Sequence, residues 1–435
     1  MKMSKVNLTV LVMILWLFLA ATPAALADVT AGDVIDKSNW DKAQGLMPDP
    51  MLEWLKRGDF SMEVVDLTYE PGDYVTPEVK KSLEANKGKY DVDANGLMIE
   101  KATGKLPKFI EGIPFPEIDP NDPNAASKLM YNKTYYSYTL GNNNYPFSVR
   151  WVGRKSGLER EVICDYKNYP LDGAPGAREE DNSEKVERMQ LILVLAPFDI
   201  KGTNIMSWRY LDDRQDSTNS YVPAIRRVRR MSPSNRSDSF VGSDICIDDA
   251  WLFDGKTMSM DWKFVGEREA LVAFLSPDPQ PLEITKNGVW RTIKGTKEPA
   301  YGYQDKTWQG APWMPTNLVW TKRLMYVIQA TPKDPYYNYG MQEIWLDAKM
   351  PLMVGWKIIH DRAGNYWKMG WETYAGHQGP EEGQKAIVGH TLMGIDDRTN
   401  HASLLRLGGG DYHVTYFDDF DRNDFTLAGF QRFCK

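Results

Sequence analysis

The sequence predicts a mainly β protein of the α+β class, built on one large antiparallel sheet with an N-terminal helical arm. Aromatic residues make up 12% of the chain, together with 34 Gly and 26 Pro, a composition that favours strands and turns over helical bundles. From Tyr131 onward apolar residues recur at every second position, which is the pattern of half-buried strands. Because these runs are frequent and their links are short, we expect neighbouring strands to run antiparallel.

The first 27 residues have the features of a signal peptide. Lys2 and Lys5 precede an apolar run from Leu8 to Ala21, and residues 25–27 (Ala-Leu-Ala) form a small-x-small cleavage site. A membrane anchor is the weaker alternative, since the run is shorter than the ~20 residues that a spanning helix needs. We expect cleavage after Ala27 and a soluble, periplasmic chain. No Cys lies near the cleavage point, which argues against a lipid anchor.

The remaining chain is expected to form an arm, residues 28–130, that is continuous with a sheet domain, residues 131–435. Within residues 28–60 apolar side chains recur at helical spacing, but prolines interrupt the pattern, so the helices there should be short. The apolar residues at helical spacing are Val34, Ile35, Trp40, Leu46, Met51, Leu52 and Leu55.

The end of the chain gives the clearest local predictions. Alternation between Leu318 and Trp371, broken by short turns, predicts an antiparallel meander. Residues 425–434 predict a final helix with Asp424 or Thr426 at its cap.

Composition and motifs exclude several classes of function. Lys and Arg total 52 against 59 Asp and Glu, a net charge of −7, which argues against nucleic-acid binding through a broad basic surface. The three cysteines, Cys164, Cys246 and Cys434, allow at most one disulfide and match no zinc or haem spacing. There is no nucleophile elbow, P-loop, dinucleotide fingerprint or His-Glu-x-x-His pair. We therefore expect no catalytic residues, no metal, no cofactor and a protein that is not an enzyme.

Acidic doublets recur along the chain, at Asp212-Asp213, Asp248-Asp249, Asp396-Asp397 and Asp418-Asp419. The last doublet begins like a calcium loop, but Asp424 stands where the turn glycine should be and Phe430 where the bidentate glutamate should be. We therefore expect these acids to be solvated loop residues rather than metal ligands.

One basic cluster stands out in this acidic chain, the run from Tyr221 to Arg230 that contains Arg226, Arg227, Arg229 and Arg230. On a strand, Arg226 and Arg230 would share the face of Val228, and the other two would point the opposite way. These arginines either pair with nearby acids or bind an anionic head group through forked hydrogen bonds. Under the second interpretation, charge reversal at Arg226 and Arg230 should weaken the binding of anionic lipids.

Large aromatic and Met side chains follow the strand faces of the C-terminal half. The default interpretation is core filling, and the alternative is that a strongly curved sheet leaves an apolar cavity for an acyl chain. The candidate cavity residues are Trp320, Tyr326, Trp356, Ile358, Trp367, Met369 and Trp371.

Four stretches of the chain resemble the family of domain of unknown function 1329 (DUF1329). They are VTAGDVIDKSNWDKAQGLMPDPMLEWLKRGDF (29–60), YVPAIRRVRR (221–230), SDICIDDAWLFDGKT with the nearby MDWKFVGERE (243–269), and the run from Arg323 to Gly370. The resemblance implies a periplasmic protein like the outer-membrane lipoprotein-sorting (LolA-like) proteins. Their fold is a half-open barrel whose concave face is closed by short helices. It also implies an outer-membrane β-barrel partner and an inner-membrane exporter of the resistance-nodulation-division type. It assigns no catalytic residue.

Residues and resemblance together favour a periplasmic carrier that shuttles a lipid or another hydrophobic molecule between membranes. A shuttle needs a water-excluded slot, because each exposed methylene costs about 0.8 kcal/mol in water. Two alternatives stay open: an exported enzyme acting on a hydrophobic or polymeric substrate, and a partner of an outer-membrane barrel that carries nothing. The enzyme would require two acids, or a His and an Asp, inside an otherwise apolar pocket.

Overall fold

The computed structural model describes residues 29–174, 182–293, 296–408 and 413–434. The expected signal peptide, residues 1–27, lies outside this part of the chain. Within the described residues, no helix is both long and apolar enough to cross a membrane.

The described residues form a mainly β fold with short helices. The main sheet contains β5 (Asn143–Gly153), β6 (Gly157–Pro170), β7 (Val186–Ala196), β8 (Asn204–Tyr210), β9 (Ser217–Val222), β10 (Arg227–Arg230), β11 (Met260–Phe274), β12 (Gln280–Ile284), β13 (Trp290–Thr292), β14 (Val319–Pro332), β15 (Gln342–Asp347), β16 (Val354–His360), β17 (Tyr366–Gln378), β18 (Lys385–Asp396), β19 (His401–Leu407) and β20 (Thr415–Tyr416). Two separate pairs are β1 (Val34–Ile35) with β2 (Met62–Glu63), and β3 (Tyr90–Val92) with β4 (Met98–Glu100). The α-helices are α1 (Asp49–Arg57), α2 (Pro77–Ala85), α3 (Ala125–Tyr138) and α4 (Leu427–Arg432). The 3-10 helices are η1 (Trp40–Ala43), η2 (Pro71–Asp73), η3 (Pro223–Ile225), η4 (Pro233–Ser237), η5 (Phe240–Gly242), η6 (Ile247–Leu252), η7 (Thr257–Ser259), η8 (Gly302–Gln304) and η9 (Arg422–Phe425).

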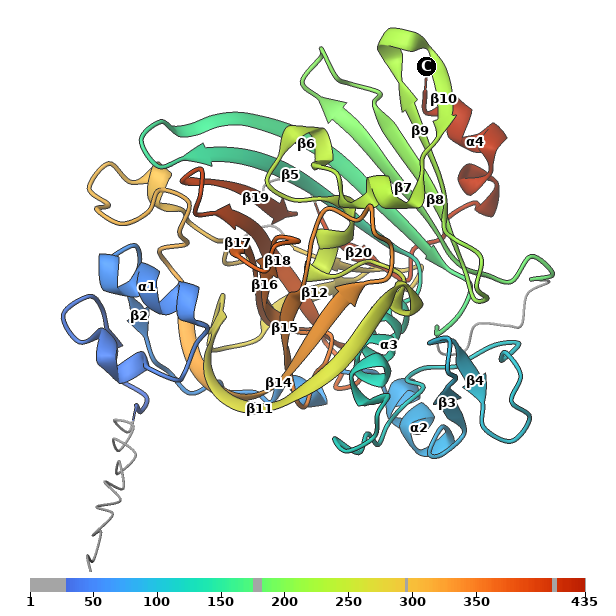
Figure 1. The fold of residues 1–435 in the computed structure, drawn as a ribbon, viewed down its shortest axis with the longest axis horizontal. Helices are drawn as coiled ribbons and strands as arrows, with labels where there is room; N and C mark the ends of the chain where they lie inside the picture. Colours follow the sequence, from blue (N-terminus) through green and yellow to red (C-terminus); the bar gives the residue numbers. More distant parts are fainter. Residues whose placement is uncertain (1–28, 175–181, 294–295, 409–412, 435) are drawn as a thin grey trace, which may run out of the picture.

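The main sheet confirms the predicted fold class, a large and strongly curved sheet with few short helices (Figure 1). Strands β14 to β17 form the predicted meander, and antiparallel pairing continues from β17 through β18, β19 and β5 to the edge strand β10. The prediction of a wholly antiparallel sheet needs one correction. Tyr374 of β17 pairs in parallel with Phe274 of β11, and His377 and Gln378 pair in parallel with β12. The sheet is therefore mixed where β17 meets β11, and there it closes into a ring.

Different segments cover the two faces of the sheet. The outer face is covered by the first part of the arm, where the Phe60 ring stacks on Trp320 at a centroid distance of 5.6 Å, and by α4, which packs on β7 and β8. The later part of the arm packs on α3 instead, where the Tyr131 hydroxyl donates to the Gly96 carbonyl. The inner face is covered by residues 232–259, which we call the plug. The plug is built of η4 to η7, so the short helices expected on the concave face are 3-10 helices.

Three local predictions can be compared with the elements. The final helix is present as α4, and the Thr426 hydroxyl caps it by accepting from Gly429 N. In the arm, α1 forms as expected, but Val34 and Ile35 belong to β1 and not to a helix. The alternating pattern does not begin at Tyr131, because α3 spans Ala125–Tyr138 and the first strand of the main sheet starts at Asn143. The expected boundary between residues 130 and 131 therefore falls inside a helix.

Candidate functional site

An apolar cavity of about 50 Å³ lies between the plug and the inner face of the sheet. The sheet lines it with Phe147, Tyr166, Ile192, Ile205, Leu405 and Leu407, and the plug with Phe240, Ile245, Ile247, Ala250 and Trp251. The remaining lining residues are Gln190, Ser207, Cys246 and Asp254. The wall is thus almost wholly hydrocarbon, and a space of this size holds a few water molecules rather than an acyl chain.

The inner face changes from apolar to charged along β7 and β8. Ile192 pairs with Ile205, then Gln190 with Ser207, then Arg188 with Arg209. Alternate residues of a strand share one face, so these three pairs form successive rungs. The cavity therefore has an apolar end near the β7–β8 turn and a charged end at the two arginines.

The part of the plug that lines the cavity has a strained backbone. The Trp251 ring lies 5.1 Å from the rings of both Tyr145 and Tyr166. Trp251 and Leu252 have φ values of 49° and 58°, and Val241 has 45°. Non-glycine residues pay of order 1–3 kcal/mol each in this region, and such strain concentrates at functional and switching segments.

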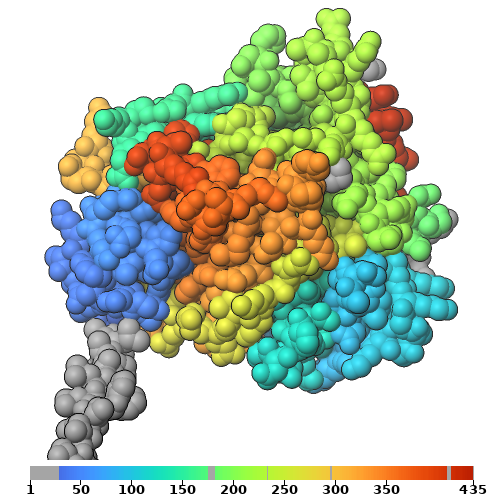
Figure 2. Space-filling model, in the orientation of Figure 1, coloured from blue at the N-terminus to red at the C-terminus, as the bar shows by residue number. Residues whose placement is uncertain are grey.

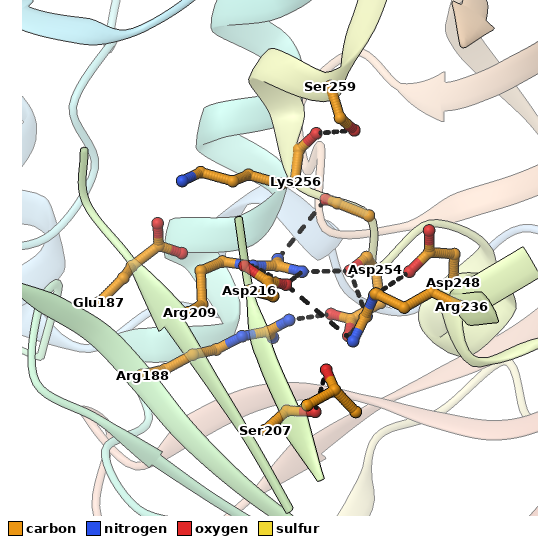
Figure 3. A network of polar contacts seen from close by, with 12 residues as sticks. Glu187, Arg188, Ser207, Arg209, Asp216, Arg236, Asp248, Asp254, Lys256 and Ser259 are labelled. Carbon is orange, nitrogen blue, oxygen red and sulfur yellow. Dashed lines mark hydrogen bonds and ion pairs between the residues drawn. The ribbon is translucent and has the colours of Figure 1, made fainter. Parts of the chain in front are cut away.

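Three carboxylates of the plug fasten it to the sheet, and a fourth binds within the plug. The Asp254 carboxylate forms ion pairs with Arg188 at 2.6 Å and with Arg236 at 3.3 Å. Its backbone carbonyl accepts a hydrogen bond from Arg209 (Figure 3). The Asp248 carboxylate pairs with Arg236 inside the plug, at 2.6 Å. The contacts of Asp254 with Arg188 and Arg209 tie the plug to β7 and β8.

The other two carboxylates bind the opposite half of the sheet. Asp249 pairs with Lys357 of β16 and accepts from the Tyr339 hydroxyl. Asp244 pairs with His401 of β19 at 2.6 Å. The plug therefore links both halves of the sheet by buried or half-buried ion pairs.

Burial and charge act in opposite directions on these acids. Burial alone would raise the pKa of Asp254, but Arg188, Arg209, Arg236 and Lys133 together lower the pKa to about 2. In the same way, Lys357 and Lys368 lower the pKa of Asp249 despite its burial. Both carboxylates are therefore charged in the folded protein at neutral pH.

Two of the acidic doublets correct the prediction of solvated loop residues. Asp248 and Asp249 are buried and ion-paired, not solvated. Asp396 is also buried, and its carboxylate accepts from the indole of Trp367. Among the described residues, no group of three or more His, Cys, Asp or Glu could hold a metal ion. All three cysteines are free.

The arginine cluster lies on and beside the edge strand β10. Arg226 ends η3 with a φ of 49° and is therefore in a turn rather than on the strand. Val228 packs in the α4 cluster on the outer face, and Arg230, which shares the face of Val228 as predicted, therefore points outward. Arg227 and Arg229 point to the inner face. All four side chains are exposed, and none forms an ion pair with a described residue.

A single row of cross-strand neighbours connects the cavity with these arginines. Arg229 pairs with Ser220, Ser220 with Ile205, and Ile205 with Ile192. Residues in one row point to the same face of the sheet. Arg229 of β10 and Ile205 of β8 are two strands apart, a distance of about 10 Å between their backbones. Of the two inner-face arginines of the cluster, Arg229 is therefore the nearer to the cavity. Charges on an edge strand also hinder edge-to-edge pairing, so a mutational control must separate the two roles.

The seven aromatic and aliphatic candidates lie elsewhere. Trp320, Trp356, Ile358, Met369 and Trp371 belong to the core under the N-terminal arm, whereas Tyr326 and Trp367 pack on the other side of the sheet. None of the seven lines the apolar cavity. Sequence reasoning missed the actual lining residues, although Met206 and Leu191 on the opposite face show the alternation that could have identified Ile192 and Ile205.

Two larger hollows are more polar. One, of about 760 Å³, lies beside α1 and contains Glu343, His360 and Asp397 near Trp54 and Trp345. Both carboxylates there already accept hydrogen bonds, Asp397 from Trp54 and Tyr366, and Glu343 from Trp345. The other, of about 670 Å³, lies behind the plug beside Arg236 and Lys256.

A family model described as protein of unknown function DUF1329 matches residues 34–426. The chain belongs to the DUF1329 family. The family resemblance found in the sequence is thereby confirmed. No protein of curated description matches the chain.

Several solved structures are similar to this DUF1329 protein. A domain named for outer-membrane lipoprotein sorting, from Vibrio parahaemolyticus, is 15% identical, with a TM-score of 0.46 over 70% of this chain and 97% of that chain. A DUF1329 family protein from Desulfovibrio piger is 15% identical, with a TM-score of 0.46 over 72% and 100%. A LolA superfamily protein from Nitrosomonas europaea is 10% identical, with a TM-score of 0.40 over 70% and 98%.

Proposed function

We propose that this DUF1329 protein is a periplasmic carrier of an anionic amphiphile, such as a fatty acid or a lipid. The hydrocarbon chain occupies the cavity beneath the plug, and the anionic head group binds Arg227 and Arg229. The observation that supports this assignment is the row from Ile192 through Ile205 and Ser220 to Arg229, which puts hydrocarbon and unpaired guanidinium groups on one face. Guanidinium groups suit this role because they bind carboxylate and phosphate through paired hydrogen bonds.

The size of the cavity requires the plug to act as a lid. A cavity of about 50 Å³ does not accept an acyl chain. Displacing Phe240, Ile245 and Trp251 would open the inner face, and each methylene that then leaves water contributes about 0.8 kcal/mol to binding. The strained backbone at Trp251 and Leu252 supports movement of this segment.

Transport between membranes is part of the same proposal. It includes an inner-membrane exporter of the resistance-nodulation-division type and an outer-membrane β-barrel as partners, both implied by the family resemblance. No catalytic residue is needed, because a carrier only exchanges one apolar environment for another.

The first experiment asks whether the protein carries anything. The protein from Asp28 to Lys435 is purified from a periplasm without detergent. Its mass is measured by native mass spectrometry, and any bound molecule is then recovered by organic extraction. A stoichiometric lipid supports the carrier proposal and names the cargo class. An empty protein that also fails to bind fluorescent fatty acids would overturn it.

Neighbouring arginines on opposite faces provide a matched control for the head-group site. Because Arg226 lies in a turn and Arg230 points outward, the test uses Arg227→Glu with Arg229→Glu, and Arg230→Glu is the control. The double variant of the two inner-face arginines should bind a fluorescent fatty acid about tenfold or more weakly than wild type, since a hydrogen bond to a charged group contributes ~1.5–3 kcal/mol. Equal losses in both proteins would mean that the arginines only protect the sheet edge.

An exported enzyme is the second candidate, and the hollow beside α1 is where it would act. There Glu343 and Asp397 lie among aromatic side chains. Among the described residues that line the cavity beneath the plug, Asp254 is the only carboxylate, and it is ion-paired. Turnover of an extracted lipid by wild-type protein that Glu343→Gln abolishes would favour the enzyme over the carrier.

A further inference from the structure

The end of the sheet beside the cavity presents exposed apolar and basic side chains together. Asn204, the first residue of β8, pairs with Tyr221 near the end of β9, so the β7–β8 and β9–β10 turns lie at the same end of the sheet. We call residues 195–203 and 222–227 the tip. In Figure 2 the green and yellow-green part of the chain that contains the tip stands out from the rest of the molecule at the top of the view.

Apolar exposure is concentrated at the tip. Phe198 is 94% exposed, the highest value among the large hydrophobic residues of the described chain. Leu195, Val222 and Ile225 are exposed as well, at 42%, 36% and 40%. Four of the ten exposed large hydrophobic residues in the described chain thus lie in the tip. Such grouping marks an interaction surface, since exposed hydrophobic residues are otherwise scattered singly.

The positive charge of the tip favours an anionic partner. Lys201, Arg226 and Arg227 are exposed there, with Asp199 as the one acid. None of the three cations forms an ion pair with a described residue. In a chain of net charge −7 this is a local positive surface around an aromatic side chain. Aromatic and aliphatic side chains between cations are the features with which proteins bind the interface of anionic membranes.

We propose that the tip docks the protein on an anionic phospholipid surface, with Phe198 and Ile225 inserted at the level of the head groups. Lys201 and Arg226 contact the lipid phosphates. The tip lies next to the apolar end of the cavity, because the cavity residues Ile192 and Ile205 precede and follow the β7–β8 turn. A docked protein therefore holds the apolar end of its cavity toward the membrane. The docking itself does not depend on which cargo the cavity binds.

The test uses full mature protein and vesicles with and without phosphatidylglycerol in phosphatidylcholine. Wild-type protein should cosediment with the phosphatidylglycerol vesicles and much less with pure phosphatidylcholine, and salt should weaken the binding. Phe198→Asp should lower the vesicle partition coefficient about tenfold or more, since the apolar contact is lost. The double variant Lys201→Glu with Arg226→Glu should bind equally to vesicles with and without phosphatidylglycerol.

Tyr336 supplies a matched control, because it is 81% exposed but lies in the β14–β15 connection. Tyr336→Asp should bind vesicles like wild type. Equal binding by Phe198→Asp and wild type, or no binding of wild-type protein to phosphatidylglycerol vesicles, would overturn the proposal. Fatty-acid uptake is measured in parallel to separate the two proposals. Uptake without vesicle binding contradicts the docking surface alone, and vesicle binding without uptake supports docking while contradicting the carrier.

Discussion

At the scale of single residues, Asp254 is the charge on which the plug depends most. Its carboxylate is buried beside Arg188, Arg209 and Arg236, which keep its pKa near 2 although burial opposes this. Replacing it by Asn would leave the buried Arg188 guanidinium without its carboxylate partner, whereas Arg209 and Arg236 would keep Asp216 and Asp248. We expect Asp254→Asn to reduce the free energy of unfolding by about 3–5 kcal/mol, the usual cost of breaking a buried pair from one side.

Urea denaturation followed by tryptophan fluorescence measures this change. Asp213→Asn is the control, because Asp213 lies in the same region but is exposed, and it should stay within about 0.5 kcal/mol of wild type. A loss below about 1 kcal/mol for Asp254→Asn would show that the plug is held by its apolar contacts alone.

Residue-level prediction from the sequence succeeded where the period of a strand decides the outcome. The alternation of Val228 with its arginine neighbours placed Arg230 on one face and Arg229 on the other, as observed. Prediction failed for Asp248 and Asp249, because no strand period relates them to their cations: Arg236 is 12 residues away in a separate 3-10 helix, and Lys357 is 108 residues away in β16. No local pattern shows that an acidic doublet will meet buried cations only after the sheet has formed.

At the scale of elements, the plug is the part of the fold that must move if the cavity is to be used. Its backbone amide at Asp244 donates to the Ser403 hydroxyl of β19 at 3.0 Å, and that hydroxyl donates to the Asp244 carboxylate at 2.7 Å. Cysteines at these two positions should therefore be able to form a disulfide that closes the plug. We expect oxidised Asp244→Cys/Ser403→Cys protein to take up fluorescent fatty acid much more slowly than wild type.

Reduction supplies the internal control for this experiment. Adding dithiothreitol should restore uptake, whereas wild-type protein, whose three cysteines are free, should not respond. Fast uptake by the oxidised protein would mean that ligand enters without movement of the plug at Asp244.

Elements that are buried on all sides were the hardest to predict. In α3, Tyr131, Tyr135, Tyr136 and Tyr138 are all at most 9% exposed, so the helix has no polar face and no helical stripe appears in its sequence. Tyrosine is common in strands, which explains why the sequence of this segment predicts a strand. The meander from β14 to β17 was predicted well because its short turns leave few other pairings.

At the scale of the whole molecule, a buried acid lies where the arm, α3 and the sheet meet. Asp172 follows β6, accepts from Ile110 N of the arm at 2.6 Å and from the Tyr135 hydroxyl of α3 at 2.6 Å. Burial raises its pKa to about 7, although these hydrogen bonds act in the opposite direction. The folded protein therefore holds this proton up to about pH 7, whereas the unfolded chain releases it above ~3.9.

This difference predicts how stability changes with pH. The unfolded state binds fewer protons at Asp172 between about pH 4 and 7, so the free energy of unfolding should fall by about 1.4 kcal/mol per pH unit from this group. Burial keeps His377 and His390 neutral by lowering their pKa values, which gives the opposite slope below pH 6.5. Wild-type protein alone therefore shows only the sum of these opposing slopes.

Comparison with Asp172→Asn isolates the group, because the other titrations cancel in the difference. The amide oxygen can still accept from Ile110 N, and the amide nitrogen can donate to the Tyr135 oxygen. We expect the variant to be close to wild type in urea denaturation at pH 4.5 and clearly more stable at pH 8, with the gap opening between these values. A gap that is constant from pH 4.5 to 8 would mean that Asp172 is already charged in the folded protein, and that the junction of arm, helix and sheet tolerates this charge.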